Sequence, residues 1–181
     1  MVSIKICSAE DAPIIADLSR QTFYETFAPV NTKENMDKFM NEQFTREKLV
    51  AEVSEPGNIF LLAYDDDTPA GYAKLKEGEK LAELDNRPSI ELVRIYAASS
   101  AIGKGVGSAL MKECMAIAAR LGKEILWLGV WENNQRAIDF YTRWGFEKFS
   151  THIFLLGDDE QTDWLMKKEL QPEDQVDNSA N

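Results

Sequence analysis

The sequence predicts a mixed α/β fold, in which a central, largely antiparallel sheet of about six to seven strands is flanked by helices. Three observations indicate this class. Apolar residues follow a helical period early in the chain and form strand-like runs from Ile59 onward. Two such runs, at 59–64 and 71–75, flank a turn and predict an antiparallel hairpin. A strand from Ile90, a helix and a strand over 125–130 form a crossover, which predicts one parallel pair.

The N-terminal region predicts one strand and one long helix. Residues 2–7 alternate apolar and polar side chains, as a half-buried strand does. Ser8 and Asp11 stand three positions apart, at capping-box spacing, and predict that a helix begins there. Apolar residues recur through this segment at an approximately helical period, so we expect the helix to end near Pro29.

Two shorter helices are predicted between this helix and the hairpin. Asn31 or Thr32 can cap the first, because both side chains accept hydrogen bonds from free backbone N–H groups. Thr45 can cap the second, which ends at the Pro56-Gly57 break. After the hairpin, whose turn is predicted over 65–69, residues 77–88 are expected to form a charged loop.

The C-terminal third completes the sheet. A helix over 134–144 stops at a glycine, and strands over 146–156 and 164–170 follow. The length fits one domain, which we place at 1–170. Residues 171–181 are polar and predict a flexible tail.

Composition and charge exclude several classes of function. The chain is 44% hydrophobic and 28% charged, as in soluble globular proteins, and it has neither a membrane-spanning run nor a signal peptide, so we expect a cytoplasmic location. The 31 acidic and 20 basic residues give a net charge of -11, which disfavours nucleic acid and anionic membranes and suits a cationic small substrate. Cys7 and Cys114 are expected to be buried free thiols, with no disulfide and no metal site.

A glycine-rich stretch joins the strand from Ile90 to the following helix. Gly103, Gly105 and Gly107 lack Cβ atoms, so backbone N–H groups and the helix N-terminus can approach a phosphate. A tight strand-to-helix turn is the alternative. Lys104, the only lysine of this loop, stands between glycines, unlike the lysine of a Walker loop, and the third glycine comes one residue too early for a dinucleotide fingerprint. The spacing therefore argues against both of these nucleotide sites.

A second group of residues lies on the short helix near the C-terminus. Asn134, Ala137 and Tyr141 are spaced i, i+3 and i+7, so they share one helical face. This helix follows the strand parallel to the glycine-loop strand, so its N-terminus is expected near the same sheet edge. An amide, a small residue and a phenol there can hold a long cofactor and donate a proton. The alternative is a core helix in which Tyr141 packs with Phe140 and Trp144.

Together these two segments resemble the Gcn5-related N-acetyltransferase (GNAT) superfamily. Gly105 and Gly107 match its glycine loop, while Ile102 stands where the family has Gln or Arg. Because that position acts mainly through its backbone amide, we expect the cofactor to bind. The second segment, Asn-x-x-Ala-x-x-x-Tyr-x-x-x-Gly-Phe, is matched in full by Asn134, Ala137, Tyr141, Gly145 and Phe146.

The resemblance implies a GNAT-like sheet that splays at its parallel pair and binds acetyl-CoA in the gap. Its pyrophosphate is expected on the backbone amides of the glycine loop, and its pantetheine is expected to pair with the glycine-loop strand. The cofactor-binding residues implied in this way are Ile95, Tyr96, Ala97, Ile102, Gly103, Lys104, Gly105, Val106, Gly107, Asn134, Ala137 and Tyr141.

The resemblance also implies direct attack of a neutral primary amine on the thioester. Tyr141 is the expected acid for the departing thiolate. Glu91 on the glycine-loop strand is the first candidate for the base, acting through water, and His152, the only histidine, is the second. For each of these two residues a structural role is the alternative. Recognition of a cation is predicted for Tyr24, Glu25, Glu34 and His152.

Shorter matches resemble the PaiA-type branch, which implies polyamines such as spermidine and spermine as acceptors. These matches include Thr22-Phe-Tyr-Glu-Thr-Phe27, Arg94-Ile-Tyr96 and Gly157-Asp-Asp-Glu-Gln-Thr-Asp163. Amino acids, aminoglycosides, protein N-termini and lysines are alternative acceptors. A non-catalytic acyl-CoA-binding regulator is the alternative class of protein. The sequence leaves both a monomer and a homodimer open.

Overall fold

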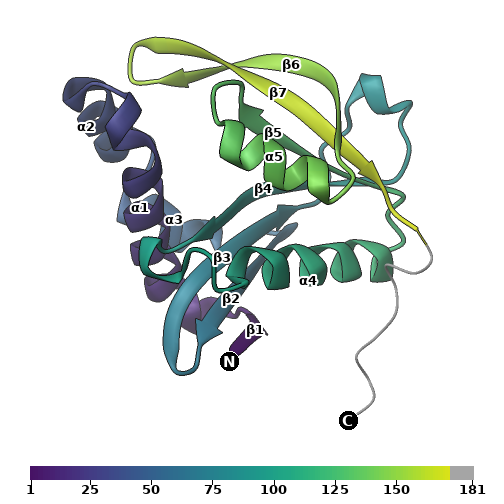
Figure 1. Cartoon of the computed structure of the whole chain (residues 1–181), viewed down its shortest axis with the longest axis horizontal. Helices are drawn as coiled ribbons and strands as arrows, with labels where there is room; N and C mark the ends of the chain where they lie inside the picture. Colours follow the sequence, from purple (N-terminus) through teal and green to yellow (C-terminus); the bar gives the residue numbers. More distant parts are fainter. Residues whose placement is uncertain (172–181) are drawn as a thin grey trace.

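A computed structural model of the chain describes residues 1–171 and contains one seven-stranded sheet in the order β1-β2-β3-β4-β5-β7-β6 (Figure 1). All neighbouring strands are antiparallel except β4 and β5, so the predicted mixed, largely antiparallel sheet is confirmed. Apart from Gln171, the predicted tail lies outside the described residues. The strands are β1 (Val2–Ile6), β2 (Asn58–Asp65), β3 (Thr68–Lys76), β4 (Ser89–Ala97), β5 (Ile125–Trp131), β6 (Glu147–Leu156) and β7 (Asp159–Glu169), and the α-helices are α1 (Ala12–Phe27), α2 (Lys33–Glu42), α3 (Arg46–Glu52), α4 (Val106–Arg120) and α5 (Gln135–Arg143).

The N-terminal helices begin at the predicted capping residues, with one adjustment. The backbone N–H of Ser8 donates to Asp11 Oδ2 at 2.9 Å, but a 3₁₀ turn over 9–11 precedes the α-helix. Thr32 rather than Asn31 caps α2, and Thr45 caps α3, each through its side-chain oxygen. Asn31 instead donates to the carbonyl of Phe27 at the end of α1, 2.9 Å away.

Two strands extend further than their apolar runs predict. β2 and β3 pair from Asp65 and Thr68, so the turn predicted over 65–69 is reduced to two residues. β7 begins at Asp159, five residues before the predicted start. Residues 159–163 are mostly polar and lack the apolar run on which the prediction depended, but backbone pairing with β6 extends the strand through them.

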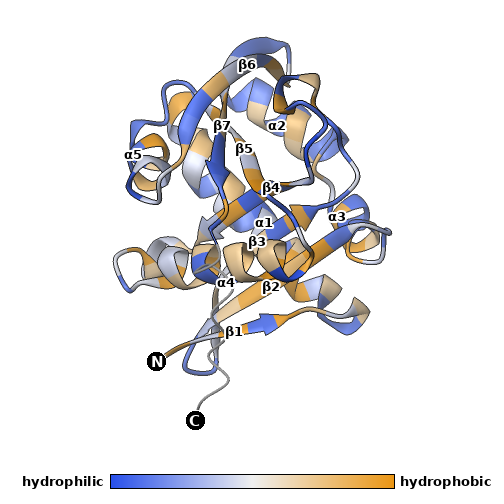
Figure 2. Cartoon of the chain, turned by 90° about the vertical axis from the view of Figure 1, so that its right-hand side faces the viewer, coloured by the Kyte–Doolittle hydropathy of each residue, from blue (hydrophilic) through white to orange (hydrophobic). Residues whose placement is uncertain are grey.

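Helices cover both faces of the sheet. α4 packs against β1 to β5, while α1 packs against β3 and β4 and also contacts α3 (Figure 1). Hydropathy colouring shows that α4 and β2 are largely apolar where they lie together (Figure 2). Successive side chains of β3 point to opposite faces of the sheet. Lys74 forms an ion pair with Glu52 of α3, whereas its neighbours Ala73 and Leu75 are completely buried in the main core.

The sheet opens between its two parallel strands. β4 and β5 pair only from Ser89 and Ile125 to Glu91 and Trp127. On the other side of β4 the register with β3 shifts, which leaves Val93 as an extra, bulged residue. Because a bulge bends its strand, the rest of β4 separates from β5, and the predicted splay is confirmed.

Other whole-chain features concern cysteines, metals and membranes. Cys114 is fully buried and Cys7 half-buried, and both are free thiols. Among residues 1–171, no three or more His, Cys, Asp and Glu side chains gather in a group able to hold a metal ion. The helices in the same part of the chain are too short or too polar to cross a bilayer.

Candidate active site

A cavity of about 730 Å³ lies where β4 and β5 separate. It falls within the size range of ligand pockets, about 300–1,000 Å³. Its walls come from the end of β4, the glycine loop, β5 and α5 on one side, and from α1, α2, β6 and β7 on the other. The two segments singled out in the sequence, the glycine loop and the Asn134–Tyr141 face, therefore line one cavity.

Two glycines of the loop are required by backbone conformation. Gly103 and Gly105 have φ values of +82° and +83°, in the left-handed region that disfavours residues with a Cβ. Gly105 is also the N-cap of α4. Gly107 differs, since it lies in the helix, where a Cβ would be 3.6 Å from the Phe140 ring. The loop thus turns sharply into a helix whose first N–H groups face the cavity region.

Some backbone amides of this loop are already bonded. Ile102 N–H donates to Ser99 O at 3.4 Å, and Lys104 N–H donates to Ala101 O at 3.2 Å. Within residues 1–171 the remaining loop amides make no intramolecular hydrogen bond, so they can bind an anion. These free amides belong to Gly103, Gly105, Val106, Gly107 and Ser108.

The side-chain charge at the cofactor end comes from α5. Lys104 forms an ion pair with Asp65 on β2 at 3.0 Å and does not line the cavity. Ile102 lines it but carries no charge. Arg136 and Arg143 do line it, and neither has a hydrogen bond or ion pair with another residue in 1–171. Neither arginine was predicted, because both occupy unspecified positions of the matched segment that runs from Asn134 to Phe146.

The Asn134–Tyr141 face combines structural and cavity-lining roles. Asn134 Oδ1 caps α5 by accepting from Ala137 N–H at 3.2 Å, which leaves its Nδ2 group available. Tyr141 packs against Phe140 and Phe146 with ring centroids 5.6 and 5.8 Å away, yet it also lines the cavity. Burial raises the pKa of Tyr141, so its phenol stays protonated at neutral pH.

Glu91, the first candidate for the base, lies at the last paired position between β4 and β5. Burial, and then repulsion from Glu79, raise the pKa of its carboxyl group to about 7. Such a value suits a general base. However, Glu91 is not among the cavity-lining residues, because its side chain lies beside Glu79 of the 77–88 loop.

His152, the second candidate for the base, faces the Asp163 carboxylate. His152 and Asp163 are directly paired across β6 and β7, with His152 Nε2 3.8 Å from Asp163 Oδ2. Asp163 lines the cavity, whereas His152 is about half exposed at the edge of the sheet. Burial raises the pKa of Asp163, and the nearby His152 opposes this shift.

The residues predicted to recognise a cation lie outside the cavity lining. Tyr24 is 47% exposed, and Glu34 lies exposed in the first turn of α2. Glu25 accepts a hydrogen bond from Ser99 N–H at 3.2 Å. On α1, which carries Tyr24 and Glu25, the cavity-lining residues are instead Phe23, Thr26 and Phe27. The acceptor end is lined by aromatic rings from four elements and a loop: Phe23, Phe27, Phe39, Phe44, Trp131 and Phe154.

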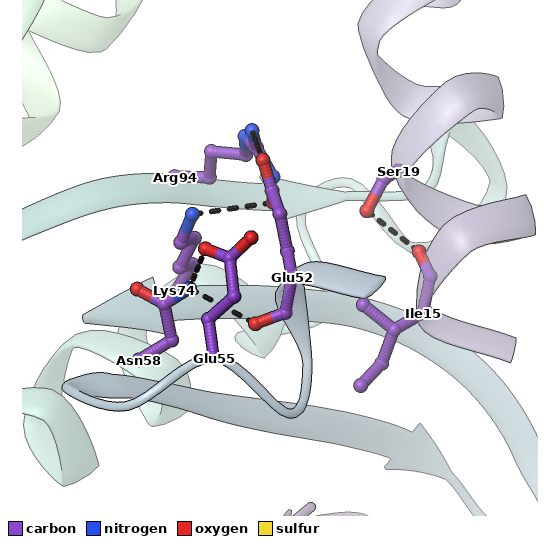
Figure 3. Close-up of polar contacts among 7 residues, drawn as sticks. All are labelled: Ile15, Ser19, Glu52, Glu55, Asn58, Lys74 and Arg94. Atoms are coloured by element: carbon purple, nitrogen blue, oxygen red, sulfur yellow. Dashed lines mark hydrogen bonds and ion pairs between the residues drawn. The ribbon is translucent and has the colours of Figure 1, made fainter. Parts of the chain in front are cut away.

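A partly buried ionic cluster lies next to this aromatic wall. Arg94 donates to both oxygens of Glu52, at 2.7 and 3.1 Å, and Lys74 lies 3.2 Å from the same carboxylate (Figure 3). The Arg94 guanidinium is also 4.8 Å from the centroid of the Phe44 ring. Glu52 therefore fixes an arginine that lines the cavity next to an aromatic side chain.

The sheet separates at its one parallel pair, and free glycine-loop amides lie beside the opening, as the resemblance to the GNAT superfamily predicts. The chain belongs to the acetyltransferase (GNAT) family, which residues 18–146 match. It is an N-acetyltransferase, and acetyl-CoA is its co-substrate.

Relatives support this family assignment over nearly the full chain. An N-acetyltransferase from the pepI 3' region of Lactobacillus delbrueckii subsp. lactis is 38% identical, with 94% of this chain and 99% of the relative covered. The spermidine N(1)-acetyltransferase of Thermoplasma acidophilum is 25% identical, with 94% and 98% covered. The crystal structure of PaiA N-acetyltransferase from the same organism, in complex with coenzyme A, superposes with a TM-score of 0.74 at 26% identity and covers 93% of this chain and 99% of that one.

Proposed function

We propose that this protein transfers the acetyl group of acetyl-CoA directly to a small, cationic primary amine. The observation that carries the proposal is that Tyr141 lines the same cavity as the free amides of the glycine loop and the open end of β4. One side of the cavity thus offers phosphate-binding groups and a proton donor. The other side offers an apolar wall for an acceptor.

The open strand end supplies further groups. Ala98 N–H donates to Ala70 O on β3, and backbone groups in an antiparallel ladder alternate in direction. Tyr96 therefore directs its backbone groups toward β3, while Ile95 and Ala97 direct theirs toward the gap. The backbone of Ile95 and Ala97 can pair with the pantetheine, and the Ile95 N–H can stabilise a developing oxyanion.

Acetyl-CoA supplies an activated thioester. The amides of the glycine loop bind and orient its phosphates, and the aromatic end orients the amine. Tyr141 holds a proton at its phenol oxygen, which the thiolate takes as the C–S bond breaks. Because burial keeps this phenol protonated, Tyr141 retains that proton throughout the neutral pH range.

Polyamines are the first candidate acceptors. Two observations support them: the net charge of -11, which attracts cations, and the similarity to a spermidine N(1)-acetyltransferase. A second candidate class, amines with an aromatic or aliphatic body, is favoured by the six aromatic rings of the acceptor wall.

An acceptor screen distinguishes these classes. Free-thiol release would be measured with spermidine, spermine, phenethylamine, amino acids, an aminoglycoside and a lysine peptide. We expect kcat/KM for spermidine and spermine to exceed that for the lysine peptide by about tenfold or more, which is about 1.4 kcal/mol. A preference for phenethylamine instead assigns the aromatic class. CoA binding without transfer to any amine would support a non-catalytic acyl-CoA-binding regulator.

Replacing Arg136 by glutamine is expected to weaken acetyl-CoA binding about tenfold, because one charge-assisted contact to a phosphate contributes about 1.5 kcal/mol. Calorimetric titration at low and high salt checks this, since the loss should shrink as salt rises. Arg120→Gln is the matched control, because Arg120 bonds to Glu113 at the far end of α4. Equal weakening in both variants would contradict a phosphate contact by Arg136.

A further inference from the structure

We propose that Asp163 binds the ammonium group of the acceptor and accepts its proton, and that His152 passes this proton to solvent. This inference rests on the proposed transfer to an amine and names the residues that make the amine nucleophilic. It replaces Glu91 as the base with a residue on the opposite half of the sheet.

Asp163 has a unique position among the described residues. It is the only carboxylate that lines the cavity, where it faces the same space as Ile95 and Tyr141. In the sheet it pairs with Trp131 of β5 on one side and with His152 of β6 on the other. An amine that enters along the aromatic wall therefore meets one negative charge, in the cavity that Tyr141 and Ile95 also line.

The Asp163 carboxylate is largely shielded from solvent but has unused acceptor capacity. Its side chain is 15% exposed, and its ionic partner among residues 1–171, His152, lies at 3.8 Å, beyond hydrogen-bond length. Burial chiefly raises the pKa of Tyr96, and the Asp163 carboxylate adds a small part of this effect, so the Tyr96 phenol is another neighbour. A buried carboxylate without a close cation is suited to pair with an ammonium ion.

Gly129 on β5 has no side chain, and this leaves space in which the side chains of Asp163 and His152 meet. A Cβ at this position would lie 3.2 Å from His152 Cε1 and 3.6 Å from Asp163 Oδ2. The other charged residues that line the cavity are Arg94, Arg136 and Arg143, of which Arg94 is paired with Glu52. His152 is thus the group placed to exchange protons with Asp163, and its 46% exposure gives it access to water.

The proton balance is complete with these groups. One proton of R–NH₃⁺ passes to Asp163 and then through His152 to solvent. The lone pair of R–NH₂ attacks the thioester carbon, the C–N bond forms and the C–S bond breaks. The thiolate takes the Tyr141 proton, and the second nitrogen proton restores the phenol. The third proton remains on the amide.

An Asp163→Asn variant tests this assignment. We expect kcat/KM for the best amine of the screen to fall about 100-fold at pH 7.5. The loss should shrink tenfold per pH unit as the pH approaches the amine pKa of about 10, because the free amine then needs no base. His152→Gln should lose about tenfold, with partial rescue by added imidazole. Glu160→Gln on the same strand, exposed to solvent, is the control.

Two outcomes would overturn the assignment. One is an Asp163→Asn variant that keeps wild-type kcat/KM at pH 7.5. The other is a loss that does not diminish at high pH, which indicates a structural role.

A binding measurement separates this proposal from the proposed function. In the CoA complex, spermidine or phenethylamine should raise the melting temperature of wild type but not of Asp163→Asn, while both proteins bind acetyl-CoA within about twofold. If the amine raises the melting temperature of both proteins equally, the role of Asp163 is refuted but the proposed function is not. A wild type that neither binds nor acetylates any amine refutes the proposed function itself.

Discussion

Replacing Tyr141 by phenylalanine is expected to lower kcat for acetyl transfer about 100-fold, the usual effect of losing a general acid. The affinity for acetyl-CoA should stay within about twofold, because the phenylalanine ring can keep the contacts with Phe140 and Phe146. The hydroxyl makes no hydrogen bond within residues 1–171, so its removal breaks no internal contact of the fold. Steady-state thiol release and calorimetric titration of acetyl-CoA measure the two quantities.

A matched Tyr→Phe control is available at Tyr64. This tyrosine is partly buried on β2 and does not line the cavity, so its phenylalanine variant should keep wild-type kcat. A large rise in the Kd of acetyl-CoA in Tyr141→Phe would assign the hydroxyl to cofactor binding. Unchanged kcat would remove Tyr141 from the reaction altogether.

Among the substitutions proposed for this protein, Glu52→Gln should cause the largest loss in the free energy of unfolding, about 3 kcal/mol. The substitution leaves Arg94 and Lys74 buried without their shared anion (Figure 3). Burial and repulsion from Arg94 already lower the pKa of Lys74, despite the opposing effect of Glu52. In a chain of this length such a loss lowers the melting temperature by roughly 6–12 °C, which thermal unfolding measures.

The same variant has a defined pH dependence. Burial raises the pKa of Glu52, but Arg94 outweighs it, so the folded-state pKa lies below the unfolded value of about 4.3. The carboxylate therefore stabilises the fold above the unfolded pKa, and this contribution is lost as the pH falls through the folded pKa. The difference in the free energy of unfolding between wild type and Glu52→Gln should be largest at neutral pH and small in acid.

Glu55 provides the matched surface control for Glu52. It is exposed and accepts one hydrogen bond from Asn58 at 3.3 Å, so Glu55→Gln should change the unfolding free energy by less than about 0.5 kcal/mol. Adding Lys74→Met to Glu52→Gln should recover part of the loss, since it removes one unpaired cation. A further, additive loss in the double variant would contradict this explanation.

Several features of the fold and site could be predicted because they depend on neighbouring residues. The caps at Thr32 and Thr45, the left-handed Gly103 and Gly105, and the spacing of the Asn134–Tyr141 face need only local backbone geometry. The crossover connection then fixed the parallel pair, because such units have one handedness and bring their ends to one edge. The glycine loop and the α5 face were therefore expected to lie together.

The side chains that complete the site depend on contacts that spacing does not encode. A bulge at Val93 and the pairing of three residues decide where β4 leaves β5, and so which residues face the gap. Lys104 bonds to Asp65, 39 positions away, rather than facing the cavity.

Asp163 reaches the cavity because β7 begins earlier than its apolar run and pairs with β5 opposite Trp131. By itself, the sequence determined the strand, loop and helices that form the cofactor end, since local periodicity and caps specify them. Only the tertiary structure decided which carboxylate and which arginines line the cavity, because strand register places Asp163 there and the position of α5 beside the opening places Arg136 and Arg143.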